Sequence, residues 1–518
     1  MLTVGRLGKL MSWKNSLSSH EQKSFVVTFA TILRELDHRS PDSSSLLKVI
    51  SFFDQESISL HMINEGAEQF RSAPDSRSSS ITTPPELQSL VTLLCSPVLL
   101  QQAIEPLLLQ SLVRCESTQG TSILHMHDSI QFVIREIARR DDCWFHLAVG
   151  LVYGAFRRIG DPASHKCWAQ CETLSPHIQS LSKLYDGYTM MDSELDRMNV
   201  GLAQYLTGRG RYSEAEALFR QTLAGTAKRH GLEHTNTLEI DEELAMVYWR
   251  QGRYNEAQAL LRQVLTSREK DFGSDLSDTL RTVHNLALTY QSQGQYKEAE
   301  AWFGKALVGR EKALGSEHPD TLATIHYMAL TYRYQERNSE AEALYGRALT
   351  ARKKALGLEH EDTLKTMNNI ANVYHAQGRY EDAETMHRRV LAIKDKLFGL
   401  DHPSTLATVH CLALNNISQG KFITAEKLLG QALAEREKLL GPEHPDTLKT
   451  VQNLAVTYDL QERHGEGLVL YMRALAGREK RLGHDHPHTL ETVRSLAKFF
   501  KEQSALLQNR FPLVFNST

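Results

Sequence analysis

Seven glycines recur at intervals of 42 residues in the C-terminal three-fifths of the chain, with no insertion or deletion between them. Thr-Leu pairs follow the same interval, from Thr237-Leu238 to Thr489-Leu490. A fixed period of this length is typical of a stacked repeat array, in which each unit packs against its neighbours. Such an array presents a long continuous surface, so the pattern favours binding, and catalysis needs separate evidence. The glycines are Gly231, Gly273, Gly315, Gly357, Gly399, Gly441 and Gly483.

The composition excludes several classes of protein. The 518 residues carry a formal net charge of −3, which gives no broad attraction to nucleic acid or to an anionic membrane. No stretch approaches the 18 uninterrupted apolar residues that indicate a transmembrane helix. Six cysteines in a chain of this length argue against a disulfide framework, so we expect a reducing compartment, the cytoplasm. Residues 1–20 contain basic and no acidic residues, as a mitochondrial leader does, but their apolar run is too short for a secretory signal.

The unit that ends at Gly315 shows what one repeat contains. Apolar residues over 280–290 fall on one face of a helix. Gly294 interrupts this pattern, and a second amphipathic run over 296–307 follows. Arg310 lies in the last turn of that run, where the helix dipole favours a cation. Each unit is therefore predicted to be a pair of antiparallel helices that must stack on its neighbours to bury its apolar faces.

This unit resembles the tetratricopeptide repeat (TPR), and more closely the 42-residue version found in kinesin light chains. The resemblance implies a mostly α-helical fold: a TPR α-solenoid of about seven helix pairs over 195–503, with a C-terminal capping helix. Glu336 and Glu462 replace the turn glycine in two units that are 126 residues apart, which indicates duplication of a three-repeat block. The residues that carry the resemblance are Leu286-Ala287, Tyr290, Gly294, Tyr296, Ala299 and Ala306.

The 42-residue interval is absent before residue 195. A buried helix is predicted over 43–53, two strands over 107–114 and 122–126, and an amphipathic helix from Asp128 onwards. Helices followed by a two-stranded wing and another helix suggest a small winged-helix-like domain with an α/β-hairpin fold. The predicted domains are a leader over 1–23, the winged-helix-like domain over 24–140, a helical connector over 141–194, the repeat array over 195–503 and a tail over 504–518.

Segments 46–63 and 122–140 resemble the winged-helix region of STAND (NB-ARC) NTPases, whose fungal receptors carry kinesin-light-chain-like repeats directly behind it. The resemblance rests on Met126-His127-Asp128. In that family the histidine of this motif senses the phosphates of a bound nucleotide. Residues 5–10 have the wrong glycine spacing for a phosphate-binding loop, and Leu10 stands in place of its hydroxyl residue. The resemblance therefore implies a chain without the NTPase module, a vestigial sensor motif, and His127 as a relic or a helix cap.

Histidines and cysteines raise the question of a metal site. Cys167 and Cys171 have a spacing compatible with zinc, and His165 and His177 lie nearby. Because this segment resembles the packed helical connector of STAND proteins, we expect no metal there. The other recurring histidines lie one to a repeat and cannot converge on one ion, so we expect them to cap helix starts. They are His234, His318, His360, His402, His444 and His486.

The concave groove of the array is the candidate binding site, since the first helix of every pair lines it in TPR proteins. Amide and imidazole groups there suit hydrogen bonding to an extended peptide backbone, although they could equally be solvated residues of the inner face. Chaperone tails are not expected as ligands, because Ala323, Leu330 and Ala407 occupy places where a carboxylate clamp needs polar residues. The predicted groove residues are His284, Asn285, Gln291, His326, Tyr327, Arg333, Asn368, Asn369, Asn372, His375, His410 and Asn453.

We therefore expect a non-enzymatic scaffold that binds a peptide or protein in the TPR groove, as the sensor or adaptor part of a STAND (NLR-like) signalling protein. A full-length STAND NTPase is a further expected partner, and no catalytic residue, metal, cofactor, nucleic acid or membrane is expected. One alternative is that the chain forms part of an ADP/ATP-dependent STAND switch. The NTPase module of that switch would be supplied elsewhere or would be missing from the gene model. The other is a kinesin-light-chain-like cargo adaptor, which predicts a heptad coiled coil that residues 1–190 lack.

Overall fold

The computed structural model of the protein describes residues 31–72, 85–118, 121–139, 141–162, 167–184, 193–272 and 277–510. Internal contacts divide the chain into two compact units, Met1–Gly208 and Arg209–Thr518. The leader predicted over 1–23 lies outside the described residues. Across those residues no single helix is long and apolar enough to cross a membrane. Leu87–Leu94 and Pro97–Leu109 reach the required length and composition only together, and they are bent by 108° at the break between them.

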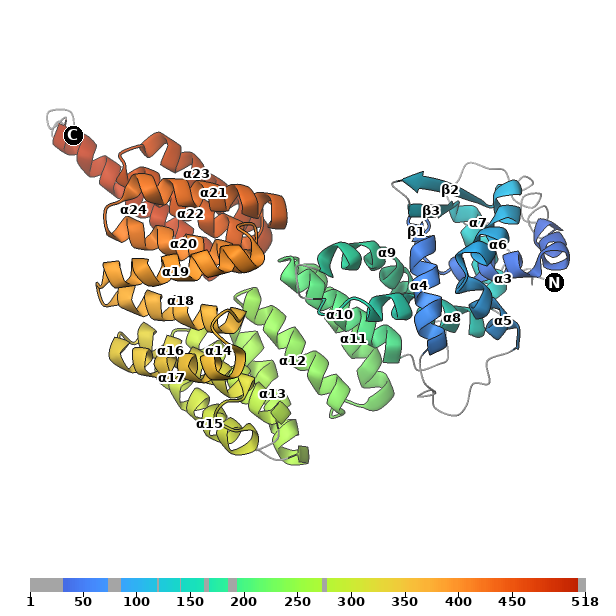
Figure 1. The fold of residues 1–518 in the computed structure, drawn as a ribbon, viewed down its shortest axis with the longest axis horizontal. Helices are drawn as coiled ribbons and strands as arrows, with labels where there is room; N and C mark the ends of the chain where they lie inside the picture. Colours follow the sequence, from blue (N-terminus) through green and yellow to red (C-terminus); the bar gives the residue numbers. More distant parts are fainter. Residues whose placement is uncertain are drawn as a thin grey trace. The chain divides into compact units, whose positions relative to one another are not determined.

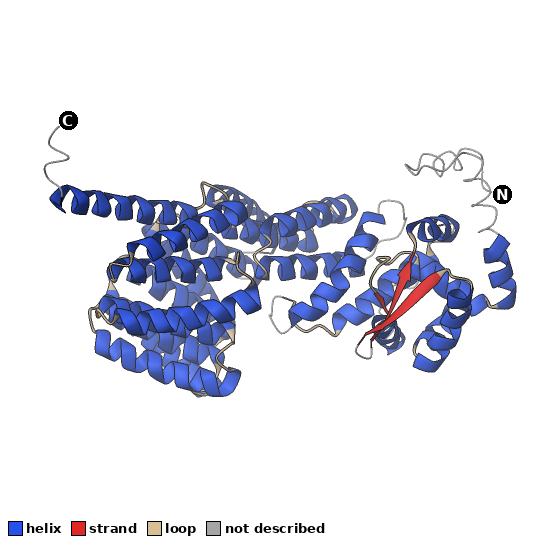
Figure 2. Ribbon diagram, turned by 90° about the horizontal axis from the view of Figure 1, so that it is seen from above, coloured by secondary structure: helices blue, strands red, loops and turns tan. Residues whose placement is uncertain are grey.

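The first unit combines helices with a small antiparallel sheet, whose strands are red in Figure 2. The strand order is β1-β3-β2, so β3 lies in the middle and pairs with both of its neighbours. The elements are α3 (Pro41–Ile50), β1 (Ile58–Ser59), α4 (Leu60–Ser72), α5 (Pro85–Leu94), α6 (Pro97–Leu109), β2 (Val113–Thr118), β3 (Thr121–Met126), α7 (Asp128–Ala138), α8 (Cys143–Arg157), α9 (Trp168–Leu184) and α10 (Ser193–Gly208).

Helices α4 and α8 form the closest packing in this unit's core. A Cβ atom added at Gly66 would lie 2.1 Å from the carbonyl oxygen of Leu151, and one at Gly154 would lie 2.4 Å from the carbonyl oxygen of Gly66. The two helices therefore approach at a distance that only glycine allows. Nearby, the buried rings of Phe52 and Phe145 meet edge to face with their centroids 5.6 Å apart.

Most of the predicted elements of this unit are present. The helix predicted over 43–53 corresponds to α3, and the strand predicted over 122–126 lies within β3. The strand predicted over 107–114 is wrong up to residue 112, because 107–109 end helix α6 and β2 begins only at Val113. Short apolar runs do not distinguish a buried helix end from a strand, and this run continues a helix that starts at the Ser96 cap. The assignment of these elements to a winged-helix-like domain stays a prediction.

The second unit is a stack of antiparallel helix pairs, coloured green to red in Figure 1. The predicted pair that ends at Gly315 is confirmed as α14 and α15. The last helix, α24, continues to Arg510, whereas residue 503 is the end predicted for the array. The helices are α11 (Tyr212–His230), α12 (Thr235–Arg250), α13 (Tyr254–Phe272), α14 (Ser277–Ser292), α15 (Tyr296–Leu314), α16 (Pro319–Tyr334), α17 (Asn338–Leu356), α18 (Glu361–Ala376), α19 (Tyr380–Phe398), α20 (Pro403–Ser418), α21 (Phe422–Leu440), α22 (Pro445–Leu460), α23 (His464–Leu482) and α24 (Pro487–Arg510).

The linker between pairs explains the 42-residue interval. Gly315 ends α15 with a φ of +91°, a conformation that favours glycine. The hydroxyl of Thr321, the threonine of the Thr-Leu pair, donates to the carbonyl oxygen of Gly315 over 2.8 Å. His318 accepts a hydrogen bond at Nδ1 from the backbone N–H of Asp320 over 3.2 Å and so caps α16. Glycine, histidine and threonine therefore recur together because each satisfies a backbone group at a helix end.

A buried cation joins each second helix to the first helix of the next pair. The Arg310 guanidinium donates to the carbonyl oxygen of Asp320 and to the hydroxyl of Thr324, each over 2.8 Å. The sequence analysis explains this cation by the helix dipole, whereas the structure buries its side chain in the core, and burial lowers its pKa. The equivalent residues make the same two bonds, to partners 10 and 14 residues further along the chain. These cations are Arg268, Arg310, Arg352, Lys394, Arg436 and Arg478.

Replacing Arg352 with alanine should lower the free energy of unfolding by about 1–3 kcal/mol, because the buried hydroxyl of Thr366 loses its donor and the part-buried carbonyl of Asp362 loses one of its donors. Arg352→Lys should lower it less, since Lys394 fills the equivalent position. Urea denaturation followed by circular dichroism measures both losses. Arg347→Ala, at a half-exposed arginine of the same helix, is the control. An equal loss in Arg352→Ala and Arg347→Ala would contradict the proposed role of the buried cations.

Candidate functional site

The first helices of the pairs line the inside of the array's curve. Each of α12, α14, α16, α18 and α20 contacts the first helix of the following pair as well as both second helices next to it, whereas successive second helices stay further apart. An array in which the first helices converge curves towards them. We call the side of the first helices that carries the predicted groove residues, together with Arg281, Lys365 and Lys449, the inner face.

Three of the predicted groove residues are buried histidines. His284, His326 and His410 are each at most 7% exposed. Burial, with a smaller contribution from neighbouring cations such as Arg310 and Arg436, lowers the pKa of each to about 3. These imidazoles are therefore neutral and covered, so in this conformation they cannot contact a ligand in the way that the sequence suggests.

Amide side chains of the inner face bond to these histidines and their equivalents across the repeat boundary. Asn453 Nδ2 lies 2.9 Å from His410 Nε2, and Asn369 Nδ2 lies 3.3 Å from His326 Nε2. Each bond joins residues that are 43 apart. The amide of Asn285 donates to Glu242 over the same separation, at 2.8 Å. These amide nitrogens hold adjacent first helices together, while the asparagines stay half-buried at the surface.

The remaining predicted residues divide between internal contacts and the surface. Gln291 is buried and donates to the hydroxyl of Thr331 over 2.7 Å. Asn368 Oδ1 lies 2.9 Å from Nδ1 of buried His387, and His375 Nε2 lies 2.9 Å from the hydroxyl of Ser418. The half-buried residues Tyr327, Arg333 and Asn372 complete the predicted set on the inner face.

Three cations of the inner face are absent from the predicted set. Lys365 and Lys449 are exposed, and neither forms an ion pair within the part of the chain that the structure describes. Arg281 is half-exposed and paired with Glu242. Lys365 and Lys449 recur 84 residues apart and alternate with Ala323 and Ala407, so the repeat register itself could have identified them.

The middle of the inner face is basic. Helices α14, α16, α18 and α20 contain acidic side chains only in their first turns. Acidic residues beyond the first turn occur towards the two ends, at Glu242 in α12 and Asp459 in α22. Lys365 therefore lies on a helix without acidic residues beyond its first turn. Lys449 lies at the edge of this stretch, on α22, where His488 and, more weakly, Lys449 lower the pKa of the Glu491 carboxyl of α24.

The histidines outside the inner face have structural roles. All six linker histidines accept a backbone hydrogen bond at Nδ1, so the prediction that they cap helix starts is confirmed. His127 caps α7 in the same way, accepting from Ser129 N over 3.2 Å, while Met126 is buried in β3 and Asp128 opens the helix. No group of residues that could hold a metal ion occurs in the described ranges.

The residues considered for zinc are occupied otherwise. Burial raises the pKa of the Cys171 thiol to about 12, so it is not a thiolate at neutral pH. Both nitrogens of buried His177 contact backbone, at 3.0 Å from Asp54 N and 3.1 Å from Ser57 O. His165 lies outside the described residues.

Comparisons with known proteins place this fold among repeat proteins. The family model described as tetratricopeptide repeat matches residues 194–270, 278–354, 325–396, 362–421 and 404–480. No curated protein matches the sequence. Nearly identical TPR-like repeats of a kinesin light chain from Podosopora anserina are 33% identical, covering 39% of this chain and 95% of that one, with a TM-score of 0.34.

Two further solved structures are similar at low identity. The STAND protein PH0952 from Pyrococcus horikoshii, which has a tetratricopeptide repeat sensor, is 12% identical over 97% of this chain and 68% of that one, with a TM-score of 0.52. A Rap protein complexed with competence and sporulation factor is 13% identical over 67% of this chain and 92% of that one, with a TM-score of 0.45.

The stability of the array should fall below about pH 6.5. An unfolded histidine has a pKa of about 6.5, whereas the folded pKa values of His284, His326 and His410 are about 3. As the pH falls from 6.5 towards 3, the unfolded chain binds protons that the folded chain does not, so the free energy of unfolding decreases. Between about pH 7.5 and 5.5 each histidine should account for about 1 kcal/mol.

Thermal denaturation at a series of pH values measures this loss. The matched control replaces all three histidines with glutamine, the residue that Gln452 supplies at the same position of a later repeat. The difference between the two proteins should grow as the pH falls. Parallel pH profiles would show that the three imidazoles are not buried in their neutral form.

Proposed function

Since the chain belongs to the tetratricopeptide repeat family, we propose that it is a non-enzymatic scaffold whose inner face binds an extended segment of a peptide or protein. The observation that carries the proposal is the pair of exposed, unpaired lysines, Lys365 on α18 and Lys449 on α22. Beyond their first turns these two helices contain one acidic residue, Asp459 at the end of α22. The two lysines favour a segment that carries carboxylates, because opposite charges across an interface select partners and speed their association.

Half-buried polar residues next to these lysines support the same proposal. The amide nitrogens of Asn369 and Asn453 are used between repeats, while their side chains stay accessible at the inner face. Tyr327 and Arg333 add an aromatic ring and a guanidinium to this surface. Aromatic and arginine side chains are enriched among residues that contribute strongly to protein interfaces. We therefore propose that Tyr327, Arg333, Asn369, Asn372 and Asn453 contact the ligand, and that the buried histidines hold these contacts in register.

We further propose that the scaffold is the sensor or adaptor part of a STAND signalling assembly in the cytoplasm, with a full-length STAND NTPase as a partner. The similarity to PH0952 supports this proposal at the level of the fold, because it extends over 97% of the chain. The six free cysteines fit a reducing compartment. A cargo adaptor of the kinesin-light-chain kind shares the array but has no observation on the inner face that favours it.

Reversing the charge of the two lysines should abolish binding of acidic peptides. Random linear peptides displayed on phage and selected on the whole chain should be enriched in Asp and Glu. A synthetic copy of a selected peptide should bind the Lys365→Glu, Lys449→Glu variant at least about tenfold more weakly, since each unfavourable charge contact costs about 1 kcal/mol. Fluorescence anisotropy measures the affinities. The control reverses Lys396 and Lys438, which are exposed on second helices. Equal losses in both variants would place binding elsewhere.

The purified chain should show no binding of ADP by isothermal titration calorimetry, because the proposed scaffold has no phosphate-binding loop. The nucleotide-switch alternative expects binding through His127. The informative variant is His127→Asn, since asparagine keeps a cap for α7 but removes the imidazole. Micromolar ADP binding that is lost in His127→Asn would replace the scaffold proposal with the nucleotide switch.

A further inference from the structure

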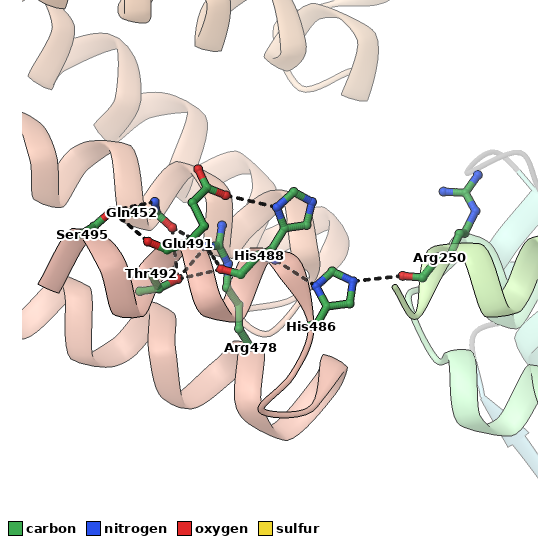
Figure 3. A network of polar contacts seen from close by, with 8 residues as sticks. All are labelled: Arg250, Gln452, Arg478, His486, His488, Glu491, Thr492 and Ser495. Atoms are coloured by element: carbon green, nitrogen blue, oxygen red, sulfur yellow. Dashed lines mark hydrogen bonds and ion pairs between the residues drawn. The ribbon is translucent and has the colours of Figure 1, made fainter. Parts of the chain in front are cut away.

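The second unit contains contacts between its beginning and its end. The Nε2 atom of His486, in the linker before α24, lies 3.4 Å from the carbonyl oxygen of Arg250 at the end of α12 (Figure 3). The guanidinium of Arg209, just before α11, donates to the carbonyl oxygen of Leu439 near the end of α21, also over 3.4 Å. These partners are 236 and 230 residues apart in the sequence. The first turns of the array therefore lie against its last linkers.

The two contacts repeat the same geometry. The turn at Gly210 meets His444 and Pro445, and the turn at Gly252 meets His486 and Pro487. Both pairs of turn glycine and linker histidine are 234 residues apart, which is about 5.6 repeats of 42 residues. A regular coil returns above its own starting edge after a fixed number of repeats. The equal separations therefore indicate that the array completes one turn and that its two edges then touch.

We call this contact between the two edges the seam; it is formed by Gly210, Gly252, His444, Pro445, His486 and Pro487. Its two glycines differ from the other turn glycines. A Cβ atom added at Gly252 would lie 2.7 Å from Cδ2 of His486, and one at Gly210 would lie 3.0 Å from Cδ of Pro445. At the equivalent Gly294 nothing lies within 4 Å. Glu336 shows that a side chain is tolerated at such a turn away from the seam, with a φ of +61°. Among the glycines at the turns within helix pairs, in the ranges that the structure describes, only the two at the seam exclude a side chain by contact as well as by backbone conformation.

Burial and hydrogen bonding at the seam agree with this contact. The side chain of His444 is 10% exposed, whereas that of its equivalent His360 is 43% exposed. His486 accepts from His488 N at Nδ1, so its remaining proton lies on Nε2 and can be donated to the Arg250 carbonyl. Burial raises the pKa of Tyr212, and the nearby carboxylate of Asp446, which follows the linker at His444, raises it further. The linkers at the end of the array are thus covered by its first turns.

We propose that this seam is a clasp that closes the array around its inner face and gates access to that face. Helix-pair turns lie along one edge of the array and linkers along the other, so contact between the edges blocks sideways entry at the seam. Both direct hydrogen bonds are 3.4 Å long, at the weak end of the range, so the clasp can open. A linear peptide can enter the closed array end first, along its axis. A cyclic peptide, which has no free end, can reach the inner face only when the clasp opens.

The clasp itself can be tested without any ligand. In Gly252→Glu the new side chain collides with His486, while Gly294→Glu places the same residue at an open turn and carries the same backbone cost. Hydrogen exchange of the amides around residues 250–253 and 484–490 should speed up about tenfold or more in Gly252→Glu alone. Small-angle scattering should show a larger radius of gyration for this variant alone. Identical behaviour of the two variants would overturn the clasp.

A milder pair of variants keeps the test valid if Gly252→Glu does not fold. His486→Asn retains a helix cap for α24 but loses the donor to Arg250, and His360→Asn makes the same change at an exposed linker. Exchange around 484–490 should rise in His486→Asn, and exchange around 358–364 in His360→Asn should stay at the wild-type level. Wild-type exchange in both variants would overturn the clasp.

The gate rests on the proposed function, and its test uses a phage-selected linear peptide and the backbone-cyclised form of the same peptide. The wild-type chain should associate with the linear form at least about tenfold faster, and Gly252→Glu should reduce this ratio while Gly294→Glu leaves it unchanged. An unchanged ratio in Gly252→Glu would overturn the gate. Failure of every peptide to bind would count against the proposed function and would leave the exchange test of the clasp intact.

Discussion

The array depends on a cation that is buried between consecutive helix pairs. The side chain of Arg310 or its equivalent extends from a second helix and donates to a carbonyl in the first turn and a threonine hydroxyl in the second turn of the following helix. A buried cation without such acceptors would be strongly destabilising. Each helix pair is therefore stable only when the following pair is folded against it. The tolerance of Lys394 at one of these positions shows that the requirement is for a long cationic donor and not for a guanidinium.

Hydrogen bonds between neighbouring first helices also run along the inner face. Because of them, a polar residue of this face can serve either to join repeats or to bind a ligand. His410 and Asn453 are bonded to each other across a repeat boundary, as are His326 and Asn369. The imidazole and amide nitrogens that bond to one another between helices are not free to recognise a ligand, although the half-buried asparagine side chains that carry those amides stay accessible. These bonds fix the spacing of the accessible side chains. The inner face therefore contains many side chains that bond to the neighbouring repeat and a smaller number that are exposed to a ligand, such as Lys365.

At the seam, residues that form an ordinary turn or helix cap in every repeat also contact a distant part of the array, because the array coils back on itself. Gly252 and Gly294 occupy equivalent turns with the same φ of +76°, and only Gly252 lies against another part of the chain. Likewise, His360 and His486 both cap a helix, and only His486 also reaches across to Arg250. The coil therefore converts repeated elements into contacts that occur only near the two ends.

The sequence by itself determined the helix pairs, their boundaries and the capping role of the linker histidines, because these depend on interactions within a few residues. The resemblance to the tetratricopeptide repeat, and not the residue pattern alone, indicated which helices carry the inner face. Only the tertiary structure decided that His284 is buried, that Arg310 lies in the core, and that the residues around 107 extend a helix. It alone brings Arg250 to His486, 236 residues away. Such distant contacts depend on how many repeats complete one turn of the coil. That number follows from small rotations between neighbouring repeats that add up along the array, and no residue pattern within one repeat reveals it.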